Sequence, residues 1–581
     1  MCGIISYIGY KNVSDVLIAG LERLEYRGYD SVGLTLLENS SFKTYKTIGK
    51  VRDIKPLVKD QENKDIQLGI GHTRWATHGK PSTLNSHPHE SKRCVIVHNG
   101  IIENYIDLRK DLISKGYIFV SETDSEVVAH LIDHLYNQNN NPLDTLRQCL
   151  AILRGAFALS IMFNDEPDTL YALRSGSPLV IGVGKDEAYI ASDISAFINE
   201  THDYIILGEK EIASVSRSII RIYNEELKEI NYTVHTTSIE QDSIGKGSYD
   251  HYMLKEIYEQ PNIMRKLLET KTPLDLSTVQ SIHIIGCGTA LHAGYLGKYW
   301  IESNTDIRVF IHVASEFRYQ KNNIDNNDLL IFISQSGETA DTLACLRYVK
   351  DLNHTTLAIV NNKTSSLANE ADHNIFIEAG FEQSVASTKA YTAQALTLYL
   401  LSHEKRNPEA IRIPTLMETL LEDKESIKEI TESIKNTKNI FFIGRGLDYA
   451  IALEGSLKLK EITYIHSEAI QAGEMKHGTI ALIDEEVVTI AIATQTHLLE
   501  KTISNVQEIL ARSGKVILIT REDFNIDPSN YTLRYNIPKI DDTLSPLLTM
   551  IPLQLLAYYT SLLKGLDVDQ PRNLAKSVTV E

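Results

Sequence analysis

The chain has 581 residues, and at roughly 150 residues per domain this length predicts about three to five domains. With 43% hydrophobic and 23% charged residues, the composition is globular and excludes a disordered, collagenous or fibrous protein. Asp and Glu (76) outnumber Lys and Arg (58), which leaves a net charge of −18. Because phosphate backbones repel such a chain and no basic run is present, we expect no nucleic-acid partner.

Cysteine usage and the chain start indicate a reduced, cytoplasmic protein. The cysteines are odd in number and scattered, which does not suit a disulfide framework; they are Cys2, Cys94, Cys149, Cys287 and Cys345. The first residues carry no basic segment, so we expect no signal peptide. Residues 543–563 are long and uncharged, but Pro546 and Pro552 interrupt them. We therefore predict a buried helix there and no membrane association.

Strand-like and helical patterns are mixed in residues 2–235, which predicts an α+β layered domain. Short apolar runs predict strands at residues 94–98, 157–163, 179–182 and 188–191, and helical periodicity covers residues 15–24, 101–115 and 124–136. Asp124 is the expected N-cap of the last helix. Polar and glycine residues at 231–250 indicate a linker, and we assign residues 236–275 to this linker and a leading helix.

The remainder alternates strand-like and helical runs, which is typical of parallel βαβ units. An internal repeat is present: residues 282–288 (IHIIGCG) are echoed by residues 440–446 (IFFIGRG), 158 positions later. Residues 329–333 recur at 487–491 by the same shift, and residues 356–360 recur near 515–519. We predict two tandem α/β doubly wound domains with parallel sheets, at 276–420 and 430–565, and a tail at 566–581.

Cys2 is the first candidate for catalysis. Removal of Met1, which we expect before so small a residue, leaves a thiol and a free α-amine on one residue. Such an amine titrates near pH ~7.7–8.0 and can serve as general base for its own thiol. The alternative is that Cys2 is only a small apolar residue in an edge strand.

The residues around Cys2 in the sequence favour catalysis on an amino-acid amide. The segment HTRWATHG (72–79) supplies Arg74, which suits a bidentate clamp on a carboxylate. Asn99 and Gly100 follow a predicted strand and offer donors to an oxyanion. Asp124 offers a carboxylate to a substrate ammonium. These are the parts needed to hydrolyse the side-chain amide of an amino acid.

These motifs resemble the class II, N-terminal-nucleophile (Ntn) glutamine amidotransferases over the first ~235 residues. The resemblance rests on CGI at the terminus and on LEYRGYDS, HTRWATHG, HNGIIEN and SETDSE. It implies that Cys2 forms a γ-glutamyl thioester and that Asn99 and Gly100 make the oxyanion hole. It further implies that Arg27 orders the chain near the terminus and that Trp75 closes the ammonia path. Glutamine binding is implied for Arg74, Thr77, His78 and Asp124.

A metal site is the alternative for the histidines of this region. His72, His78, His87, His89 and His98 lie within 27 residues. Their spacing matches no standard zinc pattern and gives no i, i+4 pair on a helix. We therefore expect no metal.

The second candidate site is a hydroxyl-rich anion pocket. Each repeat opens with a strand and Gly-x-Gly, but neither copy completes the dinucleotide-binding motif. Residues 334–339 (SQSGET) follow a predicted strand and lead into a helix, whose N-terminus favours anions. Together with residues 287–289 (CGT) and 384–389 (SVASTK), they predict a sugar-phosphate site at the carboxyl ends of the strands, rather than simple helix caps.

These elements resemble the sugar isomerase (SIS) fold, and the whole chain resembles a family of glutamine-dependent sugar-phosphate aminotransferases. The motifs are SQSGETADT, ASTKA, EGSLKLKEITYIHSEA, GEMKHG and the tail DQPRNLAKSVTVE. The resemblance implies that L-glutamine and fructose 6-phosphate become glutamate and glucosamine 6-phosphate, the first committed step of hexosamine (UDP-N-acetylglucosamine) synthesis. It implies no cofactor, because a cysteine and a lysine supply the covalent steps.

The same resemblance assigns roles in the second site. Phosphate and sugar contacts fall on Cys287, Gly288, Thr289, Ser334, Gln335, Ser336, Thr339, Val385 and Ser387. Lys576 is implied to form a Schiff base, Glu461 to move a proton between C1 and C2, and Lys458 to assist. His477 is implied to open the sugar ring from the neighbouring subunit, so we expect a homodimer. From spacing alone, Lys458 and Glu461 share a helix face, which also suits a surface salt bridge.

The chain departs from the family pattern at two positions. Ala290 replaces a usual serine after Thr289, which removes one hydroxyl from the phosphate site, and Thr479 replaces a proline after Gly478. Two other functions are the alternatives. A catalytically inactive sugar-phosphate sensor is disfavoured because Cys2, Glu461 and Lys576 are present. A fructosamine-phosphate deglycase would not need the glutaminase half.

Overall fold

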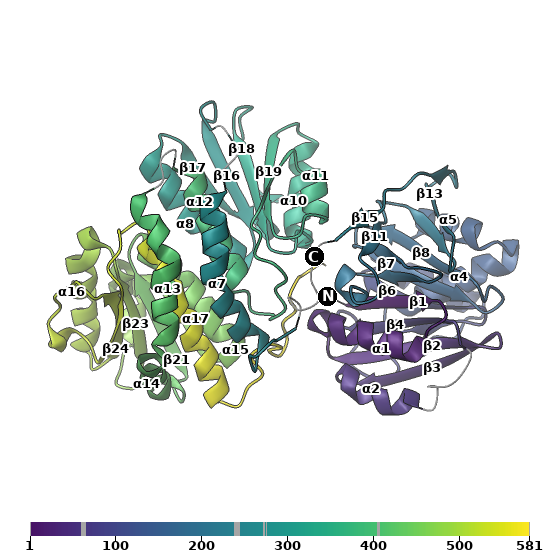
Figure 1. Cartoon of the computed structure of the whole chain (residues 1–581), viewed down its shortest axis with the longest axis horizontal. Coiled ribbons are helices and arrows are strands. Elements are labelled where there is room, and N and C mark those ends of the chain that lie inside the picture. The colour runs from purple at the N-terminus through teal and green to yellow at the C-terminus, as the bar shows by residue number, and fades with distance from the viewer. Residues whose placement is uncertain are drawn as a thin grey trace. The chain divides into compact units, whose positions relative to one another are not determined.

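The computed structural model describes residues 2–59, 66–237, 245–270, 274, 276–403 and 407–579. The chain forms two compact units (Figure 1). The first comprises Met1–Ser243 together with Ala575–Glu581, and the second comprises Ile244–Leu574.

Two antiparallel sheets form the centre of the first unit. The eight-stranded sheet has the order β15 (His235–Thr236), β11 (Asp203–Ile206), β9 (Val180–Val183), β10 (Ala188–Ala191), β1 (Gly3–Ile8), β4 (Leu68–Arg74), β2 (Ser31–Glu38) and β3 (Ser41–Ile48). The seven-stranded sheet has the order β14 (Glu229–Ile230), β13 (Ile220–Tyr223), β12 (Ile212–Val215), β8 (Leu170–Ser175), β7 (Phe157–Phe163), β6 (Cys94–Gly100) and β5 (His89–Glu90).

Helices cover the outer face of each sheet. Helices α1 (Val13–Leu24) and α2 (Val51–Val58) pack on the larger sheet, and α3 (Tyr105–Ser114), α4 (Ser125–Asn139) and α5 (Pro142–Ile152) pack on the smaller one. Side chains alternate across the strands: Ile5 and Tyr7 of β1 pack against helices, whereas Ile4 and Ile8 pack between the sheets. The four layers confirm the predicted α+β layered domain.

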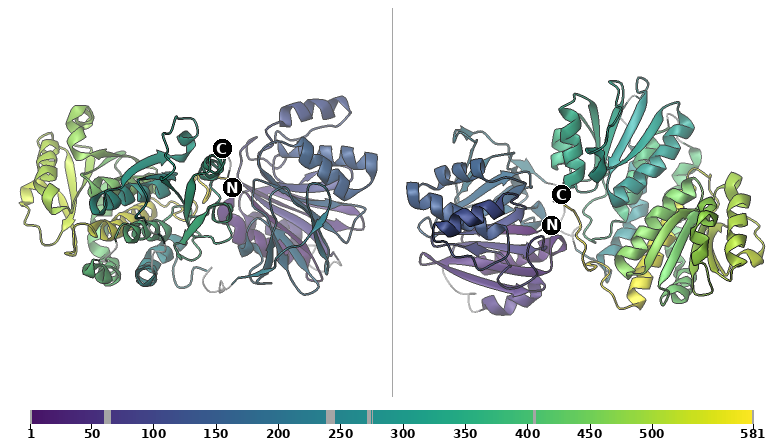
Figure 2. Two further views of the ribbon diagram at one scale, coloured as in Figure 1. Left: turned by 90° about the horizontal axis from the view of Figure 1, so that it is seen from above. Right: turned by 180° about the vertical axis from the view of Figure 1, so that it is seen from behind.

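The second unit holds two parallel sheets (Figure 2). The strands of both sheets follow the same order. One has the order β17 (Arg308–Val313), β16 (Ser281–Gly286), β18 (Leu329–Ser334), β19 (Thr355–Val360) and β20 (His373–Phe376). The other has the order β22 (His466–Gln471), β21 (Asn439–Gly444), β23 (Val488–Ala493), β24 (Lys515–Arg521) and β25 (Leu533–Ile537). The predicted tandem α/β repeat with parallel sheets is confirmed. In the sheet register, Leu329 of β18 corresponds to Val488 of β23 and not to Val487. These two strands are therefore offset by one residue more than expected.

A shared layer of helices lies between these two sheets. It contains α7 (Tyr252–Glu269), α8 (Gly288–Asn304), α12 (Lys389–Leu401), α13 (Ile413–Glu422), α14 (Lys424–Ile434), α15 (Leu447–Thr463) and α17 (Ser545–Leu563). The outer faces are covered by α9 (Ala314–Phe317), α10 (Ala340–Lys350) and α11 (Ser366–Glu370) on one sheet and by α16 (Leu499–Leu510) on the other. Helix α17 is long and apolar enough to cross a bilayer, but 83% of its apolar window is buried in this layer.

Two local expectations in the first unit need correction. The helix expected at residues 101–115 begins only at Tyr105. Asp124 occupies the N-cap position of α4, but its side chain does not cap that helix; it accepts the backbone N–H of Ile102 at 2.8 Å instead. Within the segment expected as a linker, β15 pairs with β11, and residues 238–244 lie outside the described residues.

Gly455 allows α15 to lie close to α17 and β21. A Cβ at this position would stand 2.9 Å from Leu553 Cδ1 and 3.2 Å from Phe442 Cε1. Overpacking a close-packed core costs about 1–3 kcal/mol, so we expect Gly455→Val to lower the thermal unfolding midpoint of the second unit in calorimetry. The control is Glu429→Val on the exposed face of α14, which costs only helix propensity. Equal shifts in the two variants would contradict the packing argument.

Candidate functional site

Cys2 directly precedes β1, and three side chains or backbone groups from other segments reach it. Its Sγ accepts the backbone N–H of Trp75 at 3.2 Å. Its carbonyl oxygen accepts Arg27 Nε at 3.2 Å and Asn99 Nδ2 at 3.0 Å. Arg27 is itself held by Asp193, with Nη1 3.6 Å from Oδ2. Residues far apart in sequence therefore surround the predicted nucleophile.

The electrostatic setting of Cys2 keeps its thiol protonated. Burial raises the thiol pKa above its ordinary value, and this effect outweighs the positive N-terminus and the Trp75 N–H, which both lower it. A thiol with a raised pKa carries little thiolate at neutral pH. Reaction at Cys2 therefore needs a nearby base to take the proton.

Gly100, the last residue of β6, occupies a position that only glycine fits. Its φ is +125°, a backbone conformation that other residues rarely adopt, and an added Cβ would stand 1.9 Å from the Ala156 carbonyl oxygen. Asn99 precedes it, and its side-chain amide donates a hydrogen bond to the Cys2 carbonyl oxygen. The predicted oxyanion pair is thus brought to the nucleophile by the end of β6.

Arg74 presents one edge of its guanidinium without a protein partner. Its Nη2 donates to the carbonyl oxygens of His78 at 2.5 Å and Gly79 at 3.0 Å. Its Nη1 is buried and has no hydrogen-bond partner among the described residues. Because buried donors are normally paired, this edge indicates a binding position for a carboxylate.

The other predicted glutamine-binding residues lie around the same turn. His78 Nδ1 is 4.0 Å from Asp124 Oδ1 and 3.4 Å from Thr77 Oγ1. The indole of Trp75 packs edge-on against Tyr29, with centroids 5.4 Å apart. The structure therefore brings the predicted residues of the first site together through segment 74–79 and the start of α4.

Four of the five histidines considered as metal ligands form a buried cluster beside this site. His87 packs against His72, His89 and His98 at centroid distances of 4.0, 4.6 and 6.4 Å. Burial lowers the pKa of all four, that of His72 to about 3, so the imidazoles are neutral. The described part of the chain contains no group of three or more His, Cys, Asp or Glu arranged to hold a metal.

In the second unit, helix α15 carries a buried ionic cluster. Lys458 is 1% exposed, and its Nζ lies 2.5 Å from Glu461 Oε2 and 3.4 Å from Glu454 Oε1. The shared helix face predicted for Lys458 and Glu461 is present. Burial disfavours the ammonium, but Glu461 and Glu454 outweigh burial and raise the pKa of Lys458 above its ordinary value. The pair is therefore not a solvated surface salt bridge.

Glu454 is a member of this cluster that sequence reasoning missed. It is fully buried and accepts Thr289 Oγ1 at 3.0 Å, and its other oxygen lies 2.7 Å from His292 Nδ1. It thereby joins the N-terminal part of α8 to α15 of the second repeat. The signal was in the sequence: Glu454 precedes Lys458 by one helical turn inside an apolar segment, where an acidic side chain needs a partner.

The hydroxyl-rich loop follows β18 as expected and leads into α10. Ser334 Oγ lies 3.0 Å from Thr339 Oγ1 and accepts the N–H of Gly337 at 3.0 Å. Ser336 Oγ accepts the N–H of Glu338 at 3.1 Å. The carbonyl of Gln335 accepts the N–H of Asn361 at 3.2 Å. These bonds hold the loop at the carboxyl ends of neighbouring parallel strands, where open α/β sheets bind ligands.

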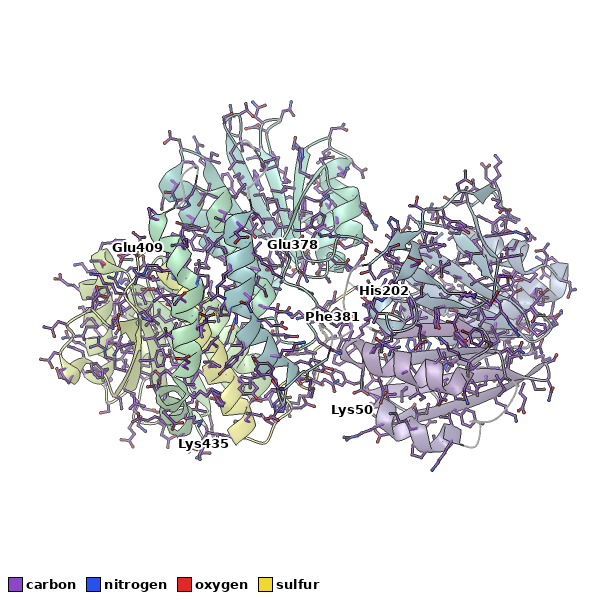
Figure 3. All side chains as sticks on the ribbon, viewed as in Figure 1. Lys50, His202, Glu378, Phe381, Glu409 and Lys435 are labelled. Carbon is purple, nitrogen blue, oxygen red and sulfur yellow. The ribbon has the colours of Figure 1, made fainter. Side chains whose placement is uncertain are left out.

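The segment between β20 and α12 is held by a second buried carboxylate that the sequence did not single out. Figure 3 labels Glu378 and Phe381 in the first half of this segment. Glu382 accepts Ser387 Oγ at 2.7 Å and the backbone N–H groups of Thr388 and Ala390 at 2.9 and 3.1 Å.

Three other predicted residues lie in the segment before α12 or at the start of α8. The N–H of Val385 donates to the carbonyl of Asp569 at 3.0 Å. Cys287 occupies the N-cap position of α8. The next residue, Gly288, has φ +51° and open space around it.

Two further residues are predicted to act in the second site. His477 is exposed at the end of a short 3₁₀ helix, Ala472–His477. Lys576 lies in the segment Ala575–Glu581, which groups with the first unit. Their catalytic roles stay predictions.

Fold and sites together define a glutamine amidotransferase joined to a sugar isomerase module. A glutamine amidotransferase domain model matches residues 73–199, and a SIS domain model matches residues 275–404 and 433–564. Glutamine–fructose-6-phosphate aminotransferases (isomerizing) from Clostridium tetani and Aquifex aeolicus are 45% and 44% identical, with all of each chain covered. The chain belongs to this family.

A solved structure of part of a relative agrees with the second unit. The C-terminal domain of the glucosamine-fructose-6-phosphate aminotransferase from Francisella tularensis is 38% identical, with a TM-score of 0.52. The match covers 56% of this chain and 100% of that chain.

The raised thiol pKa predicts how Cys2 reacts with iodoacetamide. Only the thiolate reacts, and burial raises the pKa of this thiol above its ordinary value, so we expect the alkylation rate to keep rising as the pH increases to 9. Mass spectrometry of the Cys2 peptide measures the rate, and the Cys2→Ala variant supplies the background from the other cysteines. A rate that reaches its plateau below pH 8 would contradict the buried setting of this thiol.

Proposed function

We propose that this protein converts fructose 6-phosphate and L-glutamine into glucosamine 6-phosphate and glutamate. Glutamine is cleaved at Cys2, and its ammonia passes to the SIS unit. The proposal rests on the presence of two sites in one chain that is 45% identical to such an enzyme over its full length. One site groups a thiol, amide donors and an unpaired guanidinium edge, and the other groups a buried ammonium, carboxylates and a hydroxyl loop.

In the first site, the α-amine exposed by removal of Met1 takes the thiol proton, and Sγ adds to the γ-carbonyl of glutamine. Asn99 Nδ2, which already donates to the Cys2 residue, and Gly100 stabilise the oxyanion. The Nη1 edge of Arg74 binds the α-carboxylate, and Asp124 binds the α-ammonium. Loss of ammonia leaves a thioester that water hydrolyses. Trp75 closes the path along which ammonia leaves.

In the second site, the amine of Lys576 condenses with the ketose carbonyl at C2 to form an imine and water, and ammonia then displaces Lys576 from C2. The resulting sugar imine makes the adjacent C1–H more acidic. Glu461 then moves the proton between C1 and C2, with Lys458 holding its carboxylate. The phosphate and hydroxyls of the sugar are bound by the elements that carry Thr289, Ser334 and Ser387. Ala290 adds no hydroxyl there, which weakens phosphate binding without removing a catalytic group.

The proposed assembly is a homodimer in the cytoplasm, with His477 of one subunit opening the sugar ring in the other. The exposed position of His477 leaves it accessible to a second copy. The covalent steps use a cysteine and a lysine and require no resident metal or organic cofactor. We propose neither a nucleic-acid partner nor a membrane partner.

The two half-reactions are tested separately with one variant in each site. We expect Cys2→Ala to lose glutamine hydrolysis and to retain sugar isomerisation, because each nucleophile serves one half-reaction. We expect Glu461→Gln to do the reverse. Glutamate, glucosamine 6-phosphate and glucose 6-phosphate are assayed after mixing the protein with glutamine and fructose 6-phosphate, because isomerisation without ammonia gives glucose 6-phosphate. Glutamate without glucosamine 6-phosphate from the unmodified protein would leave a glutaminase with a different acceptor.

Replacement of Arg74 by lysine tests the carboxylate clamp. Lysine supplies one point charge with three donors, so it cannot bond the His78 and Gly79 carbonyls and also hold a carboxylate through two N–H groups. A lost charge-assisted hydrogen bond costs about 1.5–3 kcal/mol, so we expect the KM for glutamine to rise by roughly 10- to 100-fold. Steady-state glutamate formation measures it. Arg93→Lys, which alters a surface pair with Asp165, is the control, and an unchanged KM in Arg74→Lys would contradict the clamp.

A further inference from the structure

His72 lies in β4, in the motif HTRWATHG, and none of the assigned steps uses it. Its side chain is fully buried. Its Nε2 lies 3.0 Å from the carbonyl oxygen of His98 and 3.1 Å from Asn99 Oδ1. Asn99 is the proposed oxyanion donor. The oxygen of its amide faces His72, and the nitrogen faces Cys2.

The hydrogen-bond pattern fixes both the tautomer of His72 and the orientation of Asn99. A carbonyl oxygen can only accept, so the Nε2 of His72 must carry the proton that faces His98. The Asn99 atom that faces the same N–H must then be an acceptor, which is Oδ1. The Nδ2 of Asn99 is thereby directed to the other side, where it donates to the Cys2 carbonyl at 3.0 Å. Without the His72 donor, only the Cys2 carbonyl oxygen would favour this orientation of the amide over the flipped one.

The surroundings of His72 keep this donor in place over the whole physiological pH range. Burial, with a smaller contribution from the charge of Arg74, lowers the pKa of His72 to about 3. The ring of His87 stacks on His72 with centroids 4.0 Å apart and an interplanar angle of 25°. The Nδ1 of His72 has no hydrogen-bond partner in the described part of the chain, which suits the neutral tautomer protonated at Nε2.

We propose that His72 is a positioning residue for glutamine hydrolysis: its Nε2–H holds the Asn99 amide so that Nδ2 points to the developing oxyanion. The proposal rests on the glutaminase activity proposed above. His72 exchanges no proton with the substrate and acts only through Asn99. A donor aligned before the reaction stabilises the transition state without reorganisation.

Two substitutions at His72 separate its hydrogen bond from its volume. His72→Met keeps a long buried side chain but removes the donor, and His72→Gln places an amide N–H near the position of Nε2. Removing one oxyanion donor outright costs about 100- to 1,000-fold in kcat, so we expect misalignment in His72→Met to lower kcat by roughly 10- to 100-fold. We expect the KM for glutamine to change little and His72→Gln to keep a kcat close to that of the unmodified protein.

Controls distinguish positioning from a structural defect. His89→Met removes another buried imidazole of the cluster, which bonds Thr123 and not Asn99, and is expected to retain kcat. Alkylation of Cys2 by iodoacetamide forms no oxyanion, so its rate should be the same in His72→Met as in the unmodified protein. In an Asn99→Ala background, His72→Met should cause no further loss, because the group it aligns is absent.

Each outcome bears on the proposal. An unchanged kcat in His72→Met, an equal loss in the alkylation rate, or a further loss in the Asn99→Ala background would overturn it. If His72→Met does not fold, a large loss of kcat in folded His72→Gln would overturn it. Absence of glutamine hydrolysis by the unmodified protein would overturn both the proposed function and this inference. A fully active His72→Met variant beside an active unmodified protein would overturn this inference alone.

Discussion

Backbone pairing between β1 and β4 is the constraint on which the first site depends. The register sets Gly3 opposite Thr73, so the residue before β1 meets the segment that follows β4. The Trp75 N–H therefore reaches Cys2 Sγ, and the unpaired edge of Arg74 lies in the same turn. The chain terminus, which in most domains is poorly ordered, is tied into the centre of a sheet. A terminal amine and thiol can be placed for catalysis only under such a restraint.

The second unit meets a different constraint, the burial of charge. Lys458 is buried in the helical layer between two sheets, where an isolated ammonium would be strongly destabilised. Glu454 and Glu461 compensate it from the same helix, and Glu454 is in turn bonded by Thr289 and His292. A well-packed apolar replacement is often no less stable than such a buried ion pair. The proposed reaction explains its presence better than stability does, since that reaction moves a proton between carbon atoms in a place shielded from water.

The two units also treat buried titratable groups in opposite ways. Beside Cys2, a stack of histidines is held neutral by burial, so hydrogen-bond directions there do not depend on pH. Beside the sugar site, the charged state of Lys458 is strengthened by its partners. An oxyanion hole needs oriented dipoles, and proton transfer needs ionisable groups with paired charges. Each environment therefore suits the half-reaction proposed for it.

The sequence by itself determined the layered first domain, the two parallel repeats, and most of the segments that form the sites. Periodicity is a local property, and apolar runs such as residues 329–333 report it directly. Tertiary structure decided what depends on contacts between distant segments. It showed that Asp124 bonds Ile102 and does not cap α4, that Glu454 joins the Lys458 cluster, and that His72 faces the Asn99 amide. These are side-chain orientations set by strand register and close packing, and no local pattern encodes the partner that a buried polar atom finds across a fold.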